Sequence, residues 1–181
     1  MEHRIVMAGL FAALIAALGL VPSFQLISGV PISAQSLGVM LCGTVLGARR
    51  GALAVIIVVV LVTLGLPLLA GGRGGPAVLA GPTVGFFLGW IPAAYVTGLV
   101  MERWRPSSVA LPAAIASLLG GVVVLYACGI VGMAAVLDRS LPEAAMLSLP
   151  FIPGDLVKCV LAGLITRGIA TARPQSLLSR A

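Results

Sequence analysis

The sequence predicts an all-α membrane protein with six transmembrane helices, and three observations lead to this fold class. Of the 181 residues, 60% are hydrophobic and 9% are charged, whereas a soluble domain carries about 25% charged residues. Continuous apolar runs such as 52–64 lack the alternating pattern of a transmembrane β-barrel. The 23 glycines allow helices to pack closely in lipid. This composition excludes a soluble globular enzyme, a disordered chain and a cytosolic binding module.

The first two spans share one long segment without formal charges. The segment between Arg4 and Arg49 is about twice as long as the roughly 20 residues that one crossing needs. Pro22 and Pro31 divide it, because proline removes a backbone donor and disfavours helix before it. We therefore expect spans at 5–21 and 35–48.

Four further spans follow, separated by charged or by proline- and glycine-rich segments. The glycine-rich segment 71–76 cannot continue a helix. The charged segment 102–105 includes Trp104, a residue suited to the membrane interface. Asp138–Glu143 forms the next expected loop. We expect these spans at 51–70, 78–101, 107–137 and 153–170, followed by a polar tail at 171–181.

The distribution of arginines predicts the orientation of the six spans. An even number of crossings leaves both termini on one side of the membrane. If that side is the cytoplasm, only Arg73 and Arg139 face outward and Lys158 lies within the membrane. The inner arginines are then Arg4, Arg49, Arg50, Arg103, Arg105, Arg167, Arg173 and Arg180. This bias satisfies the positive-inside rule and explains the net charge of +6 without a nucleic-acid partner.

A single predicted span contains ionisable groups, at Asp155 and Lys158. Pro153 suits the first position of a helix, and Asp155 then falls in the first turn, where the helix dipole favours an anion. Residues three positions apart share a helical face, and charges inside a membrane usually face a cavity or each other. We expect the pair to form the polar end of an outward-facing pocket. The alternative is that the two charges merely neutralise one another.

Two outer connections supply further candidate ligand contacts. Glycines flank Arg73 and allow the backbone to approach a ligand closely, and the guanidinium can pair with an anionic group. Thr83 follows in the motif Gly81-Pro82-Thr83. The alternative for this connection is a flexible hinge with a solvated arginine. The connection 22–35 carries amides and hydroxyls suited to a neutral polar ring, namely Gln25, Ser28, Ser33 and Gln35.

The sequence lacks the patterns of metal binding, catalysis and ATP hydrolysis. His3 is the single histidine, so a histidine-based metal site or a catalytic triad is not expected. The cysteines Cys42, Cys128 and Cys159 lie in apolar runs and form no CxxC pair. No GxxxxGK[ST] phosphate loop occurs. We expect neither a metal nor a cofactor, and any energy input must come from a partner or a gradient.

Small residues recur at every fourth position of the first span, at Ala8, Ala12 and Ala16. This spacing makes a flat groove against which another helix can pack. The groove can serve packing within the chain or contact with a partner protein. The spacing leaves both interpretations open.

Five motifs of the chain resemble, in order and spacing, the BioY family, the biotin-specific S components of energy-coupling factor (ECF) transporters. The resemblance extends from about residue 5 to 170. The sequence departs from the family at Val84-Gly85-Phe86, where Gly-Gly-Tyr is common, and at Ser33, where threonine is usual. The motifs are Val30–Gln35, Gly47–Gly51, Gly65–Pro67, Gly81–Gly85 and Phe151–Lys158.

This resemblance implies a six-helix protein of a prokaryotic plasma membrane that captures biotin from outside the cell. It implies as partners a membrane T component and cytoplasmic ABC ATPases, which supply the ATP hydrolysis. Ala8, Ala12 and Ala16 are then expected to meet the T component. The binding residues that we expect are Asp155, Lys158, Arg73, Gln35 and Thr83. An S component for another vitamin, a small membrane enzyme and a passive scaffold remain as alternatives.

Overall fold

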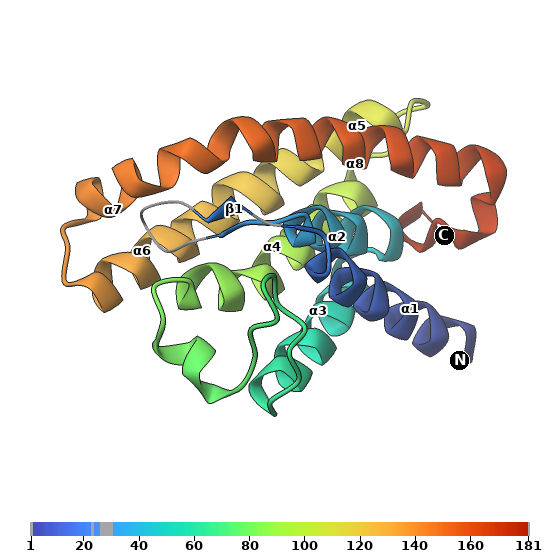
Figure 1. Ribbon diagram of the computed structural model, residues 1–181. Coiled ribbons are helices and arrows are strands. Elements are labelled where there is room, and N and C mark those ends of the chain that lie inside the picture. Colours follow the sequence, from blue (N-terminus) through green and yellow to red (C-terminus); the bar gives the residue numbers. More distant parts are fainter. Residues whose placement is uncertain (1, 23, 26–30, 181) are drawn as a thin grey trace.

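The chain folds almost entirely into helices in the computed structural model (Figure 1), which describes residues 2–22, 24–25 and 31–180. This confirms the all-α fold class. The one ladder among the described residues joins β1 (Phe24–Gln25) to β2 (Pro31–Ile32) in antiparallel register. Val30 and Ser28 of the motifs discussed above lie outside the described residues.

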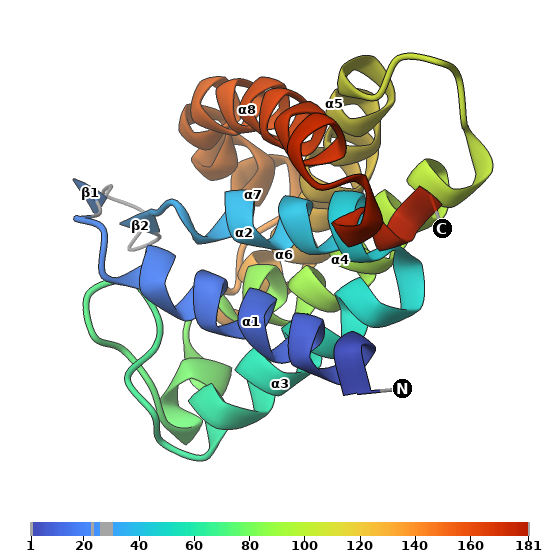
Figure 2. The ribbon, with the colours of Figure 1, turned by 90° about the vertical axis from the view of Figure 1, so that its right-hand side faces the viewer.

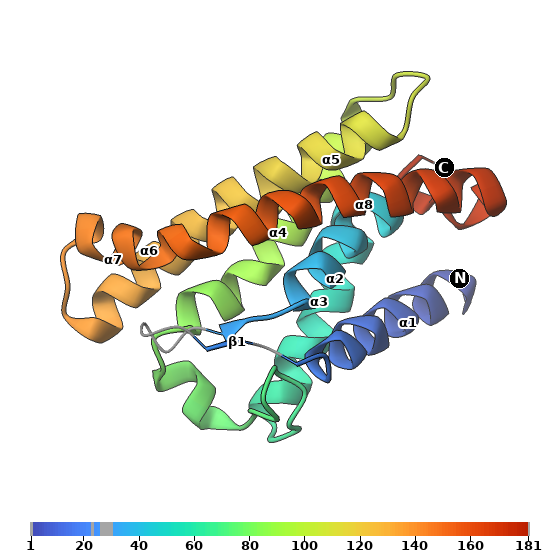
Figure 3. The same ribbon diagram turned by 45° about the horizontal axis from the view of Figure 1, so that its top comes forward.

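Within the described residues, three continuous helices are long and apolar enough to cross a membrane, and two apolar helices are shorter. The long ones are α4 (Val84–Arg103), the run α5–η3–α6 and the run α7–η4–α8. The latter two runs lie side by side along the bundle (Figure 3). Their parts are α5 (Ala110–Leu118), η3 (Leu119–Val124), α6 (Leu125–Leu137), α7 (Leu141–Ser148), η4 (Leu149–Phe151) and α8 (Ile152–Ala172). The remaining helices are α1 (Glu2–Gly19), α2 (Gln35–Leu41) with η1 (Cys42–Leu46), α3 (Ala48–Thr63) and η2 (Pro76–Ala80).

The structure differs from the expected spans at four main places. Helix α4 begins at Val84 rather than at residue 78, because residues 76–80 form the separate turn η2 before it. Helix α3 ends at Thr63 rather than near residue 70, because Gly65 takes a positive φ of 115° and Pro67 follows. The last long helix begins at Leu141, within the expected loop. Glu143 accepts a hydrogen bond from the Ser140 N–H at 2.9 Å and so satisfies a free backbone donor at this helix start. Finally, the expected tail forms two short turns, η5 (Pro174–Ser176) and η6 (Leu178–Arg180).

Helix α4 lies at the centre of the bundle, packed against α3 and α6 (Figure 2). Glycines make both contacts close. Gly98 lies so near the Gly47–Ala48 backbone that a Cβ would overlap it, and a Cβ on Gly132 would lie 2.5 Å from the Gly85 Cα. Such backbone-to-backbone approach is how helices associate in lipid, where no hydrophobic driving force separates core from solvent. Helix α4 is thereby held in one position, and its first turns line the pocket described below.

Helix α1 begins and the turn η6 ends at the same end of the bundle, far from the turn between α6 and α7 (Figures 1 and 3). The end of the chain packs onto this face. Leu177 and Ser179 are buried, and the Ser179 hydroxyl donates to the Thr44 carbonyl at 2.6 Å. Residues 174–180 therefore form part of the folded bundle.

Candidate functional site

One pocket gathers all five predicted binding residues. It opens among the start of α2, the turn before η2, the starts of α4 and α8, and the α6 helix. About 690 Å³ of empty space lies between its walls, including the part open to solvent. Its lining residues are Ser33, Gln35, Ser36, Leu69, Ala70, Arg73, Thr83, Phe86, Phe87, Trp90, Leu125, Tyr126, Phe151, Asp155 and Lys158.

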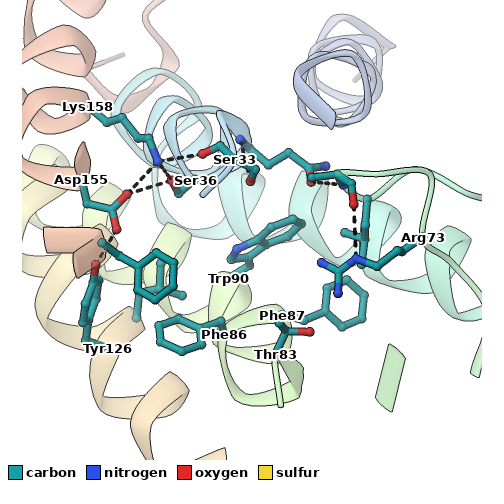
Figure 4. Close-up of a pocket in the computed structure, with 15 residues that line it drawn as sticks. Ser33, Ser36, Arg73, Thr83, Phe86, Phe87, Trp90, Tyr126, Asp155 and Lys158 are labelled. Atoms are coloured by element: carbon teal, nitrogen blue, oxygen red, sulfur yellow. Dashed lines mark hydrogen bonds and ion pairs between the residues drawn. The ribbon is translucent and has the colours of Figure 1, made fainter. Parts of the chain in front are cut away.

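The ammonium group of Lys158 is fully hydrogen-bonded at one end of the pocket (Figure 4). Its Nζ donates to the Ser33 carbonyl at 2.7 Å, to the Ser36 hydroxyl at 2.9 Å and to Asp155 Oδ1 at 2.9 Å. An ammonium has three donors, so none is left for a ligand in this arrangement. Lys158 therefore holds the start of α2 against α8 and neutralises Asp155.

The carboxylate of Asp155 collects donors from three elements. Besides Lys158, Oδ1 accepts from the Ser36 hydroxyl at 3.1 Å. Oδ2 accepts from the Tyr126 hydroxyl of α6 at 2.7 Å. A carboxylate offers about four acceptor positions, so one remains for an N–H donor that enters the pocket. Asp155 is 7% exposed, and this burial strengthens any hydrogen bond that it accepts.

The amide of Gln35 joins three parts of the chain. Its Nε2 donates to the Ile15 carbonyl at 3.1 Å and to the Leu68 carbonyl at 2.9 Å, and its Oε1 accepts from the Ala70 N–H at 2.9 Å. Gly19 permits this arrangement, because a Cβ there would overlap the Leu68 carbonyl and lie 2.9 Å from the Gln35 Nε2. Gln35 lines the pocket, but these bonds occupy both amide protons. Its observed contacts position the turn that carries Arg73.

Arg73 lies on that turn, at the other side of the pocket from Asp155 (Figure 4). Gly71 and Gly72 take positive φ values of 77° and 70°, and the turn closes with paired hydrogen bonds between Leu69 and Arg73. The Arg73 Nε donates to the Ala70 carbonyl at 3.2 Å. Among the described residues, the two terminal nitrogens make no hydrogen bond or ion pair. Burial lowers the pKa of Arg73, but a guanidinium stays protonated in proteins, so it can pair with an anion.

An aromatic wall separates the two polar ends. Phe86 meets Tyr126 edge to face with ring centroids 5.6 Å apart, and Phe87 meets Trp90 in the same way at 5.7 Å. Gly129 makes room for Phe86, since a Cβ there would overlap its ring. Such walls suit a flat apolar ring system. Thr83, 8% exposed, lies directly before α4 beside this wall.

Sequence reasoning missed Tyr126 and the aromatic wall. Tyr126 lies in the middle of an apolar run, and no local pattern marks which face of that run meets Asp155. The aromatic residues of α4 did carry a signal, because Phe86 and Trp90 are four positions apart and follow the Gly-Pro-Thr motif. The side chain of Gln25 is not among those that the structure describes.

The small residues of α1 divide between two faces. Ala8 and Ala12 are 1% and 5% exposed, since this side of α1 packs against α2 and α3, and Ala16 is half-buried. Gly9, Ala13 and Ala17 are exposed, and a Cβ on Gly9 would meet nothing within 4 Å. The stripe of small residues that is accessible to a partner is therefore shifted by one position from the predicted one.

Fold and pocket together define a class of protein, a helical membrane protein whose pocket suits a small ligand with an apolar middle and polar ends. Known proteins that this chain resembles belong to the same class. Residues 2–175 match the model of the BioY family, and the chain belongs to this family.

Three similar proteins illustrate the match. The biotin transporter BioY of Rhodobacter capsulatus is 56% identical over 99% of this chain and 100% of its own length. That of Rhizobium etli is 49% identical over 94% of both chains. The crystal structure of the S component for biotin from an ECF-type ABC transporter superposes with a TM-score of 0.88. It is 28% identical and covers 94% of this chain and 92% of its own. Proteins of this family are transporter subunits rather than enzymes.

Proposed function

We propose that this chain captures biotin from outside a prokaryotic cell as the S component of an ECF transporter. The observation that carries the proposal is the pocket, with a buried acceptor at one side, a cation with free donors at the other and aromatic rings between them. Biotin matches this order, since it has a ureido group, an apolar fused ring system and a carboxylate at the end of an alkyl chain. The names of the relatives support the same ligand.

The hydrogen-bond inventory supports one orientation of biotin. The remaining acceptor position of Asp155 suits a ureido N–H, and the free terminal nitrogens of Arg73 suit the carboxylate. Lys158 is already fully engaged, so it acts on the ligand through Asp155. Each charge-assisted bond contributes about 1.5–3 kcal/mol. Two such bonds plus burial of the ring system can reach the roughly −12 kcal/mol of nanomolar binding.

We further propose that the chain crosses the plasma membrane of a prokaryote six times, with both termini in the cytoplasm. The location of the first and last described residues at one end of the bundle supports the even number. The arginine bias supports the orientation. The pocket, with Arg73, then opens to the outside, at the far end of α4 from Arg103.

The partners in this proposal are a membrane T component and cytoplasmic ABC ATPases, which release biotin inward. Because Ala8 and Ala12 are buried within the chain, we assign the T-component contact to the neighbouring exposed stripe Gly9, Ala13 and Ala17. Ala16, half-buried, lies at the edge of this stripe.

The proposal is tested by binding of radiolabelled biotin to the detergent-purified chain. Wild-type protein should retain biotin when thiamine and riboflavin are in excess, which separates biotin from the other vitamins. Asp155→Asn should lose about tenfold or more in affinity, since one charge-assisted bond is weakened, while the protein still inserts into the membrane. Equal retention of biotin by wild type and variant would refute the role of Asp155, and displacement by another vitamin would refute the ligand.

A further inference from the structure

A second cavity lies at the opposite end of α4 from the biotin pocket. It opens between the start of α3, the last turn of α4 and the turn η6. Its empty space is about 950 Å³, including the part open to solvent. The lining residues are Leu46, Ala48, Arg49, Arg50, Tyr95, Leu99, Glu102, Arg103, Arg105, Leu178 and Ser179.

Four guanidinium groups line this cavity with one carboxylate, that of Glu102. Glu102 Oε1 accepts from the Ala48 N–H at 2.8 Å, at the start of α3. Within the part of the chain that the structure describes, ion pairs form only at Arg139 and Lys158. The four arginines therefore have no carboxylate partner there, and the cavity carries an excess of positive charge.

Two of these arginines are held in place by backbone carbonyls and two are not. Arg50 Nη1 donates to the Leu178 carbonyl at 3.2 Å, and Arg105 Nε donates to the Glu102 carbonyl at 2.9 Å. Arg49 and Arg103 are exposed and make no side-chain hydrogen bond to any described residue. Arg180, which donates to the Pro106 carbonyl at 2.9 Å, adds a fifth cation nearby. Burial, followed by the charge of Arg105, lowers the pKa of Arg180.

The wall of the cavity is apolar on the side that leads toward the middle of α4. Tyr95, Leu99 and Arg103 follow one another at intervals of four and share a helical face. At 1.5 Å per residue, the helix backbone of this wall extends about 12 Å from Arg103 to Tyr95. On α3, Leu53 is 47% exposed and lies one turn from Arg49. Cationic groups at one end and an apolar track at the other suit an amphiphile.

We propose that this cavity binds the phosphate of an anionic phospholipid in the cytoplasmic leaflet, with an acyl chain along Tyr95 and Leu99. Guanidinium groups bind phosphate oxygens in a bidentate manner, and Arg49 and Arg103 have donors free to do so. An acidic peptide or a free phosphate would leave the apolar wall unused. The assignment to the inner leaflet rests on the proposed orientation, whereas the binding itself does not depend on biotin.

The proposal is tested by native mass spectrometry of the full-length protein in detergent. The probes are phosphatidylglycerol, phosphatidylcholine, glycerol phosphate and inorganic phosphate. We expect phosphatidylglycerol to bind about tenfold more tightly than the other three, and Arg49→Gln/Arg103→Gln to lose this preference. The matched control is Arg167→Gln/Arg173→Gln, which removes two exposed arginines outside the cavity and should keep it. Biotin binding, measured in parallel, should persist in both double variants and shows that they are folded.

Equal phosphatidylglycerol binding by the two double variants would overturn the site. Binding of glycerol phosphate or inorganic phosphate as tightly as the lipid would overturn the lipid as ligand and leave a free anion site. If wild-type protein bound phosphatidylglycerol but not biotin, the proposed function would be refuted and the lipid site would stand, because lipid binding is measured without biotin.

Discussion

The hydroxyl of Tyr126 on α6 donates to Asp155 Oδ2 on α8 at 2.7 Å. This bond connects the two longest helical runs at the deep end of the pocket. Together with Lys158 and Ser36 on the other oxygen, it fixes the direction in which the remaining acceptor position of Asp155 points. A carboxylate held by three donors is pre-organised, so little side-chain entropy is lost when a ligand N–H binds.

The buried pair Asp155–Lys158 predicts strong coupling between two substitutions. Lys158→Met leaves a buried carboxylate without its cation and should destabilise the protein by about 3–5 kcal/mol. Asp155→Asn/Lys158→Met removes both charges and should recover part of this loss. Melting temperatures of Asp155→Asn, Lys158→Met and the double variant, compared with wild type in detergent, measure the effect. Additive losses would mean that the two groups act independently and would contradict the pairing.

The hydrogen bonds of Gln35 predict that Gln35→Glu weakens ligand binding indirectly, by displacing the turn that carries Arg73. The variant keeps an acceptor for the Ala70 N–H but loses both donors to the Ile15 and Leu68 carbonyls, whose oxygens then face a carboxylate. We expect faster amide hydrogen exchange at Ala70 and about tenfold weaker biotin binding. Unchanged exchange at Ala70 together with weaker binding would instead indicate direct contact between Gln35 and biotin.

The proposed orientation of biotin predicts that Arg73 senses the ligand carboxylate. Arg73→Gln should weaken binding of biotin about tenfold but change binding of uncharged biotin amide less than about twofold. Isothermal titration of both ligands measures this difference. Arg73→Lys, which keeps the charge but not the fork of donors, should fall between wild type and Arg73→Gln. If Arg73→Gln weakened the binding of biotin and of biotin amide equally, the proposed orientation of biotin would be contradicted.

Because α4 and α6 are in close contact, one methyl group added at their crossing should clearly lower the stability of the fold. Gly132→Ala places a Cβ 2.5 Å from the Gly85 Cα and should destabilise the fold by about 1–3 kcal/mol. Gly168→Ala is the matched control in α8, because its Cβ meets nothing within 4 Å and alanine favours helix. Thermal unfolding in detergent compares them. A Gly132→Ala variant as stable as Gly168→Ala would argue against this helix crossing.

The two faces of α1 predict separate effects on assembly and on folding. Ala13→Leu alters the exposed stripe and should prevent co-purification with the T component, while biotin binding persists. Ala8→Leu enlarges a buried side chain and should lower the melting temperature of the isolated chain by overpacking. The assembly defect is checked by co-expression with the T component and ATPases. Complex formation by Ala13→Leu at wild-type level would place the contact elsewhere.

Much of this protein was determined by its sequence alone. The scarcity of charge indicated a membrane protein, whose backbone groups are satisfied in lipid only in helices or closed barrels. The continuous apolar runs then excluded a barrel and left an all-helical fold. The three-residue spacing of Asp155 and Lys158 already placed them on one face, and the structure joins them at 2.9 Å. The five predicted binding residues also meet in one pocket.

Other features were decided by the tertiary structure. The engagement of Gln35 by Ile15, Leu68 and Ala70 joins segments distant in sequence, and no local pattern specifies such a contact. The same holds for Tyr126 and Asp155. For α1 the reason is the solvent: lipid is as apolar as the protein core, so a membrane helix needs no polar face to mark its outer side. Sequence periodicity therefore could not tell whether Ala8 or Gly9 faces a neighbouring helix of the same chain, and packing alone decided it.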